Sequence, residues 1–416
     1  MIEVDTIVQG DCLEVMNTFP DKSINCCITS PPYWGLRDYG IEPLIWDGDP
    51  ECEHTFDSDN AYHDNLRYRV GYNTSVGNNI NPKIYTILHR GSTKSNVQNK
   101  SSITNGTSES QFCLKCNAWR GSLGLEPTMD MYISHLCSIF DEVKRVLRDD
   151  GTLWVNLGDT YASNGSQETR FWYSDNPGKH KFNGDGELSK GYSGRCRTSE
   201  VPSKSLCMIP FRFAIEMVNR GWILRNDIIW HKPNCMPSSA KDRFTVDFEH
   251  VFFFTKSKRY YFEQQFEPIK MDSIMRARRG VDESNKYNQE KYQPLGVCMP
   301  TMSKPREFIG YDGVNNEYEN HQGRNKRAVW SITTKGFSEA HFATFPETLI
   351  EPMVKAGCPE GGLVYDPFMG AGTVAVVAKR LNRRYIGSEL KAEYIEMANR
   401  RIGKEIPQME FSLAGG

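Results

Sequence analysis

The sequence predicts an α/β fold in which helices cover both faces of a mostly parallel sheet. Short apolar runs that resemble strands alternate along the chain with stretches whose apolar residues recur at helical spacing. With 416 residues, the chain is long enough for one large core with insertions, or for two domains.

The individual elements follow from this alternation. Apolar runs rich in β-branched or aromatic residues predict strands at 6–9, 23–29, 152–157, 223–230, 249–255, 363–365 and 384–387. Apolar residues three or four positions apart predict helices at 12–18, 132–147, 211–219, 349–356 and 373–381. Asp150 and Gly151 are expected to end the second of these helices.

Three polar stretches interrupt the alternation. They cover residues 57–111, 163–197 and 270–324, and each is longer than an ordinary connection between elements. We therefore expect them to be insertions into the α/β domain.

The composition indicates an ordinary core with long polar loops, because 38% of the residues are apolar and the mean hydropathy is −0.56. A net charge of −2 and a pI near 6.5 do not by themselves indicate a nucleic-acid partner. Basic patches at 256–259, 276–279 and 324–327 are candidates for phosphate contact, although such a patch is more often a solvated face.

Cellular location is predicted from the absence of targeting signals. The beginning of the chain does not resemble a signal peptide, and no run approaches the roughly 18 apolar residues of a membrane span. Most of the twelve cysteines lie in apolar strings, which is typical of reduced core thiols. These features predict a cytoplasmic protein without a membrane partner.

The strongest chemical signal lies near the C-terminus, where an apolar strand ends in Asp366-Pro367-Phe368 and a glycine turn follows. Gly370 and Gly372 allow the backbone to approach a ligand closely, and the helix that begins at Thr373 offers free N–H groups to an anion. The next strand ends in Glu389, whose carboxylate suits a ribose diol.

These glycines alone do not choose a cofactor. The spacing Gly370-x-Gly372-x-x-Ala375 also satisfies the dinucleotide fingerprint of nicotinamide and flavin enzymes. A nicotinamide-dependent oxidoreductase, or a glycine turn without a ligand, is therefore open at this point.

A second signal, Ser30-Pro31-Pro32-Tyr33-Trp34, follows directly after the strand at 23–29. Both prolines fix φ and lack an N–H group, so they impose a rigid extended corner at the strand end. A Pro-Pro turn with packed aromatic residues is the simpler explanation. The functional explanation is a rigid corner that holds a ligand.

Together, Thr29-Ser30-Pro31-Pro32-Tyr33-Trp34 and Asp366-Pro367-Phe368-x-Gly370-x-Gly372-Thr373 resemble the amino-group DNA methyltransferases that use S-adenosylmethionine. The Pro-Pro-Tyr motif precedes the cofactor glycines, which resembles the circularly permuted (beta) class of that family. The resemblance covers about residues 1–50, 113–160, 205–268 and 324–402. It implies a Rossmann-like, seven-stranded, mostly parallel methyltransferase sheet that is circularly permuted and carries polar insertions.

The resemblance assigns cofactor roles to residues at matching positions. Asp366 is expected to hold the methionine ammonium group, and Glu389 the ribose hydroxyls. Gly370, Gly372 and Thr373 are expected to hold the carboxylate. Phe345, in a segment that leads into the cofactor strand, is expected to close over the methionine side, and Phe368 is a further expected cofactor-binding residue.

The role of Asp11 stays open at this point. Gln9-Gly10-Asp11 resembles the motif whose acidic residue meets the adenine amino group of the cofactor. An N-cap for the helix at 12–18 explains the same aspartate.

The same resemblance gives the rigid corner a catalytic role. An amino nitrogen on a base is a poor nucleophile, because its lone pair is delocalised into the ring. The Ser30 hydroxyl and a backbone carbonyl of Pro31-Pro32 are expected to accept hydrogen bonds from the amino group, which aims its lone pair at the methyl group. Tyr33 is expected to stack on the target base, which must be flipped out of the duplex.

The first residue of the motif predicts the target base. In the family this position is usually Asp or Asn where adenine N6 is methylated, and Ser is commoner where cytosine N4 is. Ser30 therefore favours N4-methylcytosine, with N6-methyladenine as the alternative. A non-enzymatic DNA-binding module would leave Asp366 and Glu389 unexplained, and methylation of RNA or of a protein glutamine fits the permuted order less well.

The expected domain organisation follows from the motif order. Residues 1–267 are expected to form the catalytic half, with insertions at about 52–116 and 163–200. Residues 268–330 are the expected target-recognition insertion, and 331–416 the cofactor-binding half. Double-stranded DNA is the expected partner, and a cognate restriction endonuclease acting separately is a candidate second partner.

A metal site is predicted at the base of the first insertion. Cys52-x-His54 precedes the polar loop and Cys113-x-x-Cys116 follows it. Three thiols and one imidazole are a closed ligand set for structural zinc. Each pair is weak evidence alone, but two pairs that bracket one long loop indicate a staple at its base. Reduced surface thiols, and less plausibly a disulfide, are the alternatives.

Overall fold

The computed structural model describes residues 3–35, 41–56, 111–163, 196–197, 200–268, 324–334 and 345–406. The chain divides into two compact units. The first unit comprises residues 1–30, 145–156 and 222–416, and the second comprises 31–144 and 157–221. Within the described ranges, no helix is both long and apolar enough to cross a membrane.

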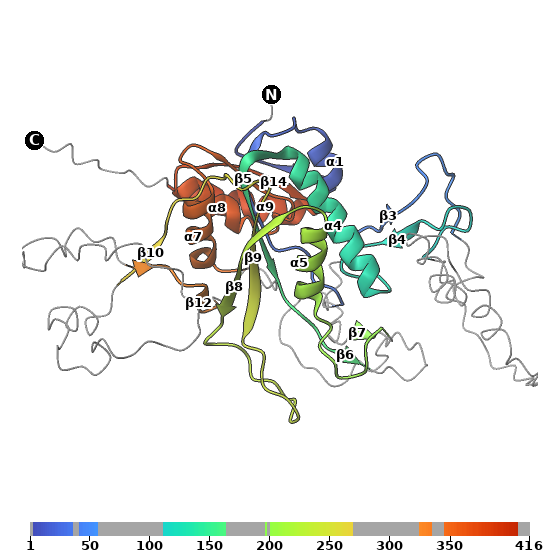
Figure 1. Cartoon of the computed structure of the whole chain (residues 1–416). Helices are drawn as coiled ribbons and strands as arrows, with labels where there is room; N and C mark the ends of the chain where they lie inside the picture. The colour runs from blue at the N-terminus through green and yellow to red at the C-terminus, as the bar shows by residue number, and fades with distance from the viewer. Residues whose placement is uncertain are drawn as a thin grey trace, which may run out of the picture. The chain divides into compact units, whose positions relative to one another are not determined.

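An eight-stranded sheet is the centre of the fold, and its strands follow the order β1-β14-β13-β2-β5-β9-β8-β12. Several of them are labelled in Figure 1. The strands are β1 (Thr6–Gln9), β2 (Ile24–Thr29), β5 (Leu147–Leu157), β8 (Ile223–His231), β9 (Phe248–Thr255), β12 (Val329–Ser331), β13 (Leu363–Asp366) and β14 (Arg384–Glu389). The pairs β1–β14, β14–β13, β13–β2, β2–β5 and β8–β12 are parallel, whereas β8 and β9 are antiparallel. The predicted mostly parallel sheet is confirmed.

The sheet joins the two ends of the chain, as the permuted motif order predicts. β13 and β14 lie between the N-terminal strands β1 and β2. Tyr365 pairs with Cys27, and Gln9 pairs with Glu389. Because these four strands are parallel, their carboxyl ends meet at one edge of the sheet. We call this edge, formed by the carboxyl ends of β1, β14, β13 and β2, the carboxyl edge.

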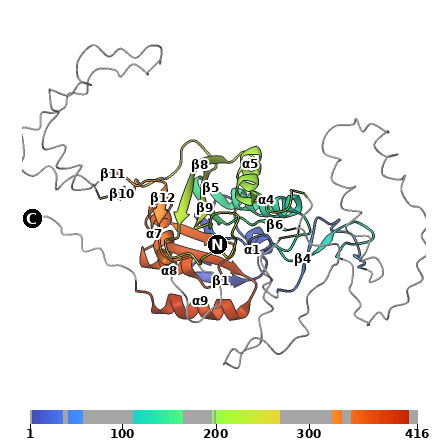
Figure 2. The ribbon, with the colours of Figure 1, turned by 90° about the horizontal axis from the view of Figure 1, so that it is seen from below.

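Helices cover both faces of this part of the sheet. Three helices, α7 (Glu347–Gly357), α8 (Thr373–Arg380) and α9 (Ala392–Lys404), lie next to one another (Figures 1 and 2). Val364 belongs to the apolar cluster that these helices share with the sheet. Its neighbour Tyr365 contacts Phe19, which follows α1 (Cys12–Asn17), with ring centroids 5.4 Å apart. Successive side chains of a strand point to opposite faces, so α1 and α7–α9 cover different faces.

Two details differ from the sequence-based prediction. The sheet has eight strands instead of seven, because the three-residue strand β12 pairs with β8. The helix α4 (Met129–Val146) ends before Asp150-Gly151, and β5 begins at Leu147. The pairing of β2 with β5 shifts between Ile24 and Cys26, so a bulge absorbs the polar residues that were expected to end the helix.

Helix α9 was not predicted, because only Ala398 and Ile402 of its side chains are buried. The helix is polar on average, so it does not stand out as an apolar segment even though its few apolar residues recur at helical spacing. The ribbon of β10 (Phe266–Glu267) and β11 (Arg324–Asn325) was also missed. This antiparallel ribbon brackets most of the predicted recognition insertion, of which residues 269–323 lie outside the described part of the chain.

The second unit contains α4, α5 (Ile209–Asn219) and two short ribbons. β3 (Leu44–Trp46) pairs antiparallel with β4 (Trp119–Gly121), and β6 (Ala162–Ser163) pairs with β7 (Cys196–Arg197). α4 and α5 contact each other through Phe140 and Phe213, whose ring centroids are 5.4 Å apart. Strands of two or three residues are too short for their alternation to be recognised in the sequence.

Candidate active site and metal cluster

Asp366 is the buried acid of the carboxyl edge. It ends β13 and is only 1% exposed. Its Oδ1 accepts a 2.6 Å hydrogen bond from the Thr29 hydroxyl at the end of β2, and one of 3.0 Å from the backbone N–H of Phe368. Burial raises the pKa of Asp366 to about 7. The carboxyl group is therefore only partly ionised near pH 7, and a bound cation would favour its charged form.

The glycine turn follows Asp366 and leads into α8. Gly370 has φ of +51° and Gly372 has φ of +75°, in the left-handed region that favours glycine. A Cβ added to Gly372 would lie 2.7 Å from the Cβ of Ala398 in α9, so close helix packing also requires glycine there. Glycine is therefore favoured at both positions by the backbone, and at Gly372 by packing as well.

An arginine that sequence analysis missed supports this turn. Arg401, in α9, donates from Nη1 to the carbonyl of Ala371 at 2.5 Å and to the hydroxyl of Thr373 at 3.1 Å. Because the Thr373 oxygen accepts this bond, its own proton is available for donation to an anion. No sequence motif marks Arg401, since it reaches the turn from another helix.

Glu389 ends β14 next to the same turn. Its Oε2 accepts from the Gly370 N–H at 2.9 Å, and its Oε1 accepts from the Lys391 N–H at 2.9 Å. Burial raises the pKa of Glu389. Each carboxylate oxygen can accept more than one hydrogen bond, so both retain capacity for ligand hydroxyls.

Asp11 acts as the N-cap of α1, which is one of the two roles that the sequence predicted for it. Its Oδ1 accepts from the N–H groups of Leu13 at 2.9 Å and Glu14 at 3.4 Å. The preceding Gly10 donates its N–H to the Glu389 carbonyl at 3.1 Å, so Asp11 follows directly on the carboxyl edge. A contact with adenine stays a prediction.

The two predicted aromatic contacts lie in the first unit. Phe368 is half-buried beside Asp366, and Phe345 packs partly buried against the apolar cluster of the sheet. Residues 341–344, which precede Phe345 in the predicted closing segment, lie outside the described ranges.

A polar group that sequence analysis did not single out continues the edge beyond Ser30. Thr29 pairs with Val155, so Ser30 and Asn156 follow neighbouring positions of β2 and β5. Asn156 donates to Glu249 at 2.8 Å, and Glu249 also forms an ion pair with Lys232. These strand-end positions carry polar residues within apolar runs, which is the signal that could have identified them.

The Pro-Pro-Tyr corner belongs to the second unit, which begins at Pro31. The Pro32 carbonyl accepts a 2.8 Å hydrogen bond from the Tyr132 hydroxyl of α4. A Cβ on Gly124 would lie 3.0 Å from the Tyr33 carbonyl, and one on Gly158 would lie 2.6 Å from Cε2 of the Tyr33 ring. Two close glycines and one hydroxyl therefore fix the corner.

A buried histidine supports the segment that packs against the corner. The ring of His135 in α4 stacks between Trp46 and Trp119, and it bonds to Asp47 at 2.8 Å and to Glu126 at 3.1 Å. Burial alone would lower the pKa of His135, but the two carboxylates raise it. Burial also raises the pKa of Glu126. His135 and Glu126 therefore hold a shared proton more firmly than separate groups would.

The family of the chain follows from its similarity to known proteins. A family model described as DNA methylase, for N6 and N4 methyltransferases, matches residues 24–400. The chain belongs to this DNA methylase family. The predicted membership of the amino-group DNA methyltransferases is thereby confirmed.

Curated relatives of this methylase cover nearly its whole length. The Type II methyltransferase M.Cfr9I of Citrobacter freundii is 31% identical over 96% of this chain and 88% of its own. M.SmaI of Serratia marcescens is 30% identical over 95% of this chain and 90% of its own. A solved structure titled PvuII DNA methyltransferase (cytosine-N4-specific) covers 95% of this chain and 85% of its own, with 16% identity and a TM-score of 0.46.

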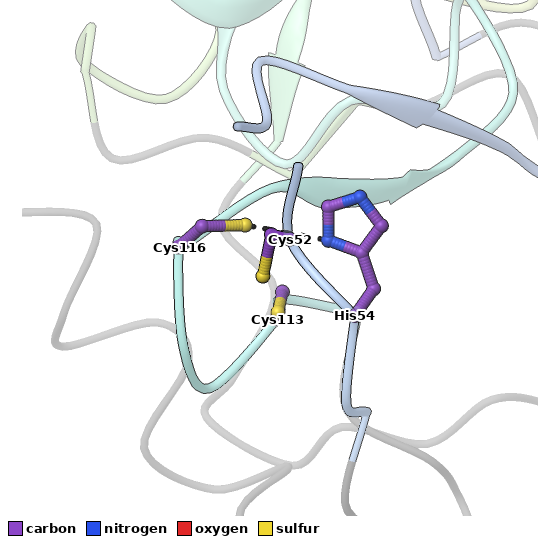
Figure 3. A group of neighbouring side chains, drawn as sticks. All are labelled: Cys52, His54, Cys113 and Cys116. Carbon is purple, nitrogen blue, oxygen red and sulfur yellow. Dashed lines mark hydrogen bonds between the residues drawn. The ribbon is translucent and has the colours of Figure 1, made fainter. Parts of the chain in front are cut away.

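The second unit of the methylase also carries the predicted metal ligands. The ligand atoms of Cys52, His54, Cys113 and Cys116 all lie within 4.8 Å of one another (Figure 3). The Sγ of Cys116 is 3.3 Å from Nδ1 of His54. The structure therefore brings together all four residues, although His54 and Cys113 are separated by the first polar insertion.

Backbone amides shape one side of this cluster into a knuckle. The N–H groups of Thr55 and Lys115 each donate to the Sγ of Cys113 at 3.4 Å, and Asn117 turns the chain with φ of +63°. Burial opposes ionisation of Cys113, but the N–H donors outweigh it and lower the pKa of Cys113 to about 5. Burial and the neighbouring thiols raise the pKa of Cys52 to about 11.

Proposed function

We propose that this methylase transfers a methyl group from S-adenosylmethionine to N4 of cytosine in duplex DNA. The observation that carries the proposal is the convergence of Ser30, Asp366 and Glu389 at the carboxyl edge of a single unit. A cofactor site and the first residue of the Ser-Pro-Pro-Tyr motif thus share one edge. A nicotinamide oxidoreductase would use the glycines but would leave Ser30 without a role.

The residues of the carboxyl edge fit S-adenosylmethionine. A buried carboxylate at Asp366 suits the methionine ammonium group, and the carboxylate of Glu389 suits a ribose diol. The N–H groups at the start of α8 and the hydroxyl proton of Thr373 suit the methionine carboxylate. When bound, the cofactor supplies a methyl group on a positively charged sulfur. Such a group needs an electron pair and no strong base.

Ser30 and the corner that follows it would aim the electron pair of the amino nitrogen of the base at the methyl group. The Ser30 hydroxyl and a carbonyl of the Pro-Pro corner accept hydrogen bonds from the amino protons of the base, which draws the nitrogen toward tetrahedral geometry. The Pro32 oxygen already accepts from Tyr132, which leaves it capacity for one further bond. Ser30 is too weak a base to take the surplus proton, so this proton leaves to water after transfer.

The choice of cytosine rests on Ser30. A hydroxyl at this position accepts a hydrogen bond without carrying charge, and serine is commoner in the family among N4-cytosine enzymes. The decisive experiment is nucleoside digestion and mass spectrometry of plasmid DNA methylated by the pure protein. N4-methylcytosine is the expected product. N6-methyladenine as the only product would refute the assignment of the base and leave the methyltransferase assignment intact.

Cofactor use has its own test. Calorimetry with S-adenosylmethionine should show binding to the wild type and none to Asp366→Ala, whereas NADH should not bind. Normal cofactor binding by Asp366→Ala and Gly372→Val would refute the assigned cofactor site. Transfer of labelled methyl groups to duplex DNA, RNA and protein in parallel identifies the substrate class.

We also propose that residues 268–330 choose the target sequence. This insertion is basic and follows the last strand before the cofactor half, and the β10–β11 ribbon closes its base. Arg278→Ala or Arg279→Ala should weaken DNA binding and reduce its salt dependence, without a change in cofactor affinity. Arg278 and Arg279 lie outside the described residues. Sequencing of DNA from cells that express the chain would identify the site, and a test of cleavage protection would show whether a restriction endonuclease shares it.

Finally, we propose that Cys52, His54, Cys113 and Cys116 hold a structural zinc ion. Four neutral or anionic S and N ligands within 4.8 Å match the size of a tetrahedral zinc site, whose metal–ligand bonds are about 2.0–2.3 Å long. The backbone donors to Cys113 are the kind of outer contact that orients a metal ligand. The ion would close the first insertion at its base.

Metal analysis tests this proposal. Protein purified without chelator should contain about one zinc per chain, and Cys113→Ser should lose it. Cys235→Ser removes a cysteine outside the cluster and should retain the ion, which makes it the matched control. Absence of zinc from the wild type would refute the site.

A further inference from the structure

The loop that joins β8 to β9 carries the two most exposed large apolar side chains of the described residues. Phe244 is 96% exposed and Met236 is 89% exposed. Val246, in the same loop, is 46% exposed. Phenylalanine rings normally bury most of their surface, and three exposed apolar side chains in one loop suit a partner that covers them.

Hydrogen bonds fix the base of this loop, and the side chains at its tip are exposed. Lys232 donates its N–H to the carbonyl of Asp247 at 2.7 Å, which closes the loop. The Asn234 side chain donates to the Thr334 carbonyl at 2.8 Å and accepts from the Thr334 N–H at 2.9 Å. The loop extends beyond the ends of both strands (Figure 1). Phe244 is thus presented from a rigid support.

The base of the loop also lies at the edge of the sheet where Ser30 is found. Thr29 pairs with Val155, and the next residue of β5, Asn156, bonds to Glu249 at 2.8 Å. Glu249 pairs across β8–β9 with Trp230 and forms an ion pair with Lys232 at the start of the loop. This chain of contacts runs within the first unit.

The tip carries exposed cations. Lys241, Asp242 and Arg243 are all exposed in the loop, so two cations flank one carboxylate, and Arg243 directly precedes Phe244. Cations beside an apolar ring fit a partner with a charged outside and a stacked apolar inside, which describes duplex DNA.

We propose that Phe244 enters the DNA stack and fills the space that the target base leaves when it turns toward Ser30. The inference rests on the proposed function, because it needs a base that leaves the duplex. Removal of a base from the stack is unfavourable, and an inserted apolar side chain restores stacking with the neighbouring bases. Met236 extends the apolar tip, and Lys241 and Arg243 contact the adjacent phosphates.

The test compares two duplexes that carry the site mapped for the wild type. One is fully paired, and the other has a mismatch opposite the target base, so that its pairing is already broken. Phe244→Ala should lower kcat/KM about ten- to hundredfold on the paired duplex and less than about threefold on the mismatched one. With 2-aminopurine at the target position, the fluorescence rise seen with wild type should be lost. Phe244→Leu, which stays apolar, should retain intermediate activity.

Ile406→Ala is the matched control, because Ile406 is 79% exposed after α9, outside the β8–β9 loop. It should leave both duplexes unaffected, and cofactor affinity should be normal in every variant. Equal losses on both duplexes, or no loss, would overturn the role of Phe244 while the methylase assignment stands. Loss of dimerisation in Phe244→Ala, with unchanged activity, would assign the tip to a second copy of the chain and also overturn it. A wild type that methylates neither duplex would overturn the proposed function and the inference together.

Discussion

The hydroxyl of Thr29 donates a 2.6 Å hydrogen bond to Oδ1 of Asp366, although 337 residues separate them in sequence. Both residues end strands of the same parallel sheet, and both are about 1% exposed. Thr29 precedes Ser30, which we assign to the target base, and Asp366 is the acid that we assign to the cofactor. One buried bond therefore connects the two sites.

Loss of this bond should weaken cofactor binding. Thr29→Val keeps the side-chain shape but removes a donor to the Asp366 carboxylate, so the pKa of Asp366 should rise further. At pH 7, calorimetry should show an affinity for S-adenosylmethionine about five- to tenfold lower, corresponding to about 1–1.5 kcal/mol. Thr152→Val removes another buried hydroxyl of the sheet, bonded to the Gly357 carbonyl at 2.9 Å, and should leave the affinity unchanged. Equal affinity in Thr29→Val would show that the bond does not tune Asp366.

The cofactor affinity should also depend on pH. The pKa of Asp366 is raised to about 7 in the cofactor-free protein, so the carboxyl is neutral below this pH and an ammonium ligand must displace its proton. The affinity should therefore fall about tenfold from pH 8 to pH 6 relative to Asp366→Asn, which cannot titrate. Isothermal titration of both proteins across this range measures the ratio. A constant ratio would contradict the raised pKa.

The two glycines of the turn before α8 should differ sharply in how well they tolerate replacement by alanine. Gly372→Ala brings a Cβ to 2.7 Å from the Ala398 Cβ and should destabilise the fold by about 2–4 kcal/mol, with loss of cofactor binding. At Gly370 the nearest atom to an added Cβ is 3.9 Å away, so Gly370→Ala should cost only the backbone strain of about 1–2 kcal/mol. Chemical denaturation measures both. Ala398→Gly should partly rescue Gly372→Ala, and similar losses in both single variants would argue against the packing explanation.

The position of the Tyr33 ring should depend on the absence of a side chain at Gly158. A Cβ at Gly158 would lie 2.6 Å from the ring, so Gly158→Ala should displace Tyr33 and lower kcat about ten- to hundredfold. The cofactor affinity should stay normal, since Asp366 and Glu389 belong to the other unit. Gly403→Ala, where an added Cβ meets nothing within 4 Å, is the control and should leave kcat unchanged. A wild-type kcat in Gly158→Ala would show that Tyr33 has no role in catalysis.

His135 should stabilise the second unit most at low pH. Its pKa is raised by Asp47 and Glu126, so the stability that it adds is fully present below about pH 6.5 and is lost as pH rises through the raised value. His135→Gln should cost about 3 kcal/mol at pH 6, because two carboxylates lose their buried partner, and less at pH 9. Thermal unfolding of both proteins at the two pH values checks the sign. A cost that grows with pH would show that His135 is neutral in the folded protein.

The sequence by itself determined the local parts of this protein. Strands such as Thr6–Gln9 and helices such as Thr373–Arg380 follow from periodicity and from the glycines before α8. The motif residues were recognisable because each lies at the end of a strand, where a polar side chain breaks an apolar run. The four metal ligands were recognisable from two short spacings on either side of one polar insertion.

Only the tertiary structure decided which distant residues support these motifs. Arg401 at the cofactor turn, Tyr132 at Pro32 and Glu249 beside Asn156 reach their partners from elements far away in sequence. The exposure of Phe244 could not be predicted from the sequence either, because an aromatic residue in a loop is buried or exposed depending on what packs against it. The periodicity of apolar residues shows only which face of a single helix or strand is apolar. Contacts between segments depend on the path of the whole chain, and therefore on the folded sheet.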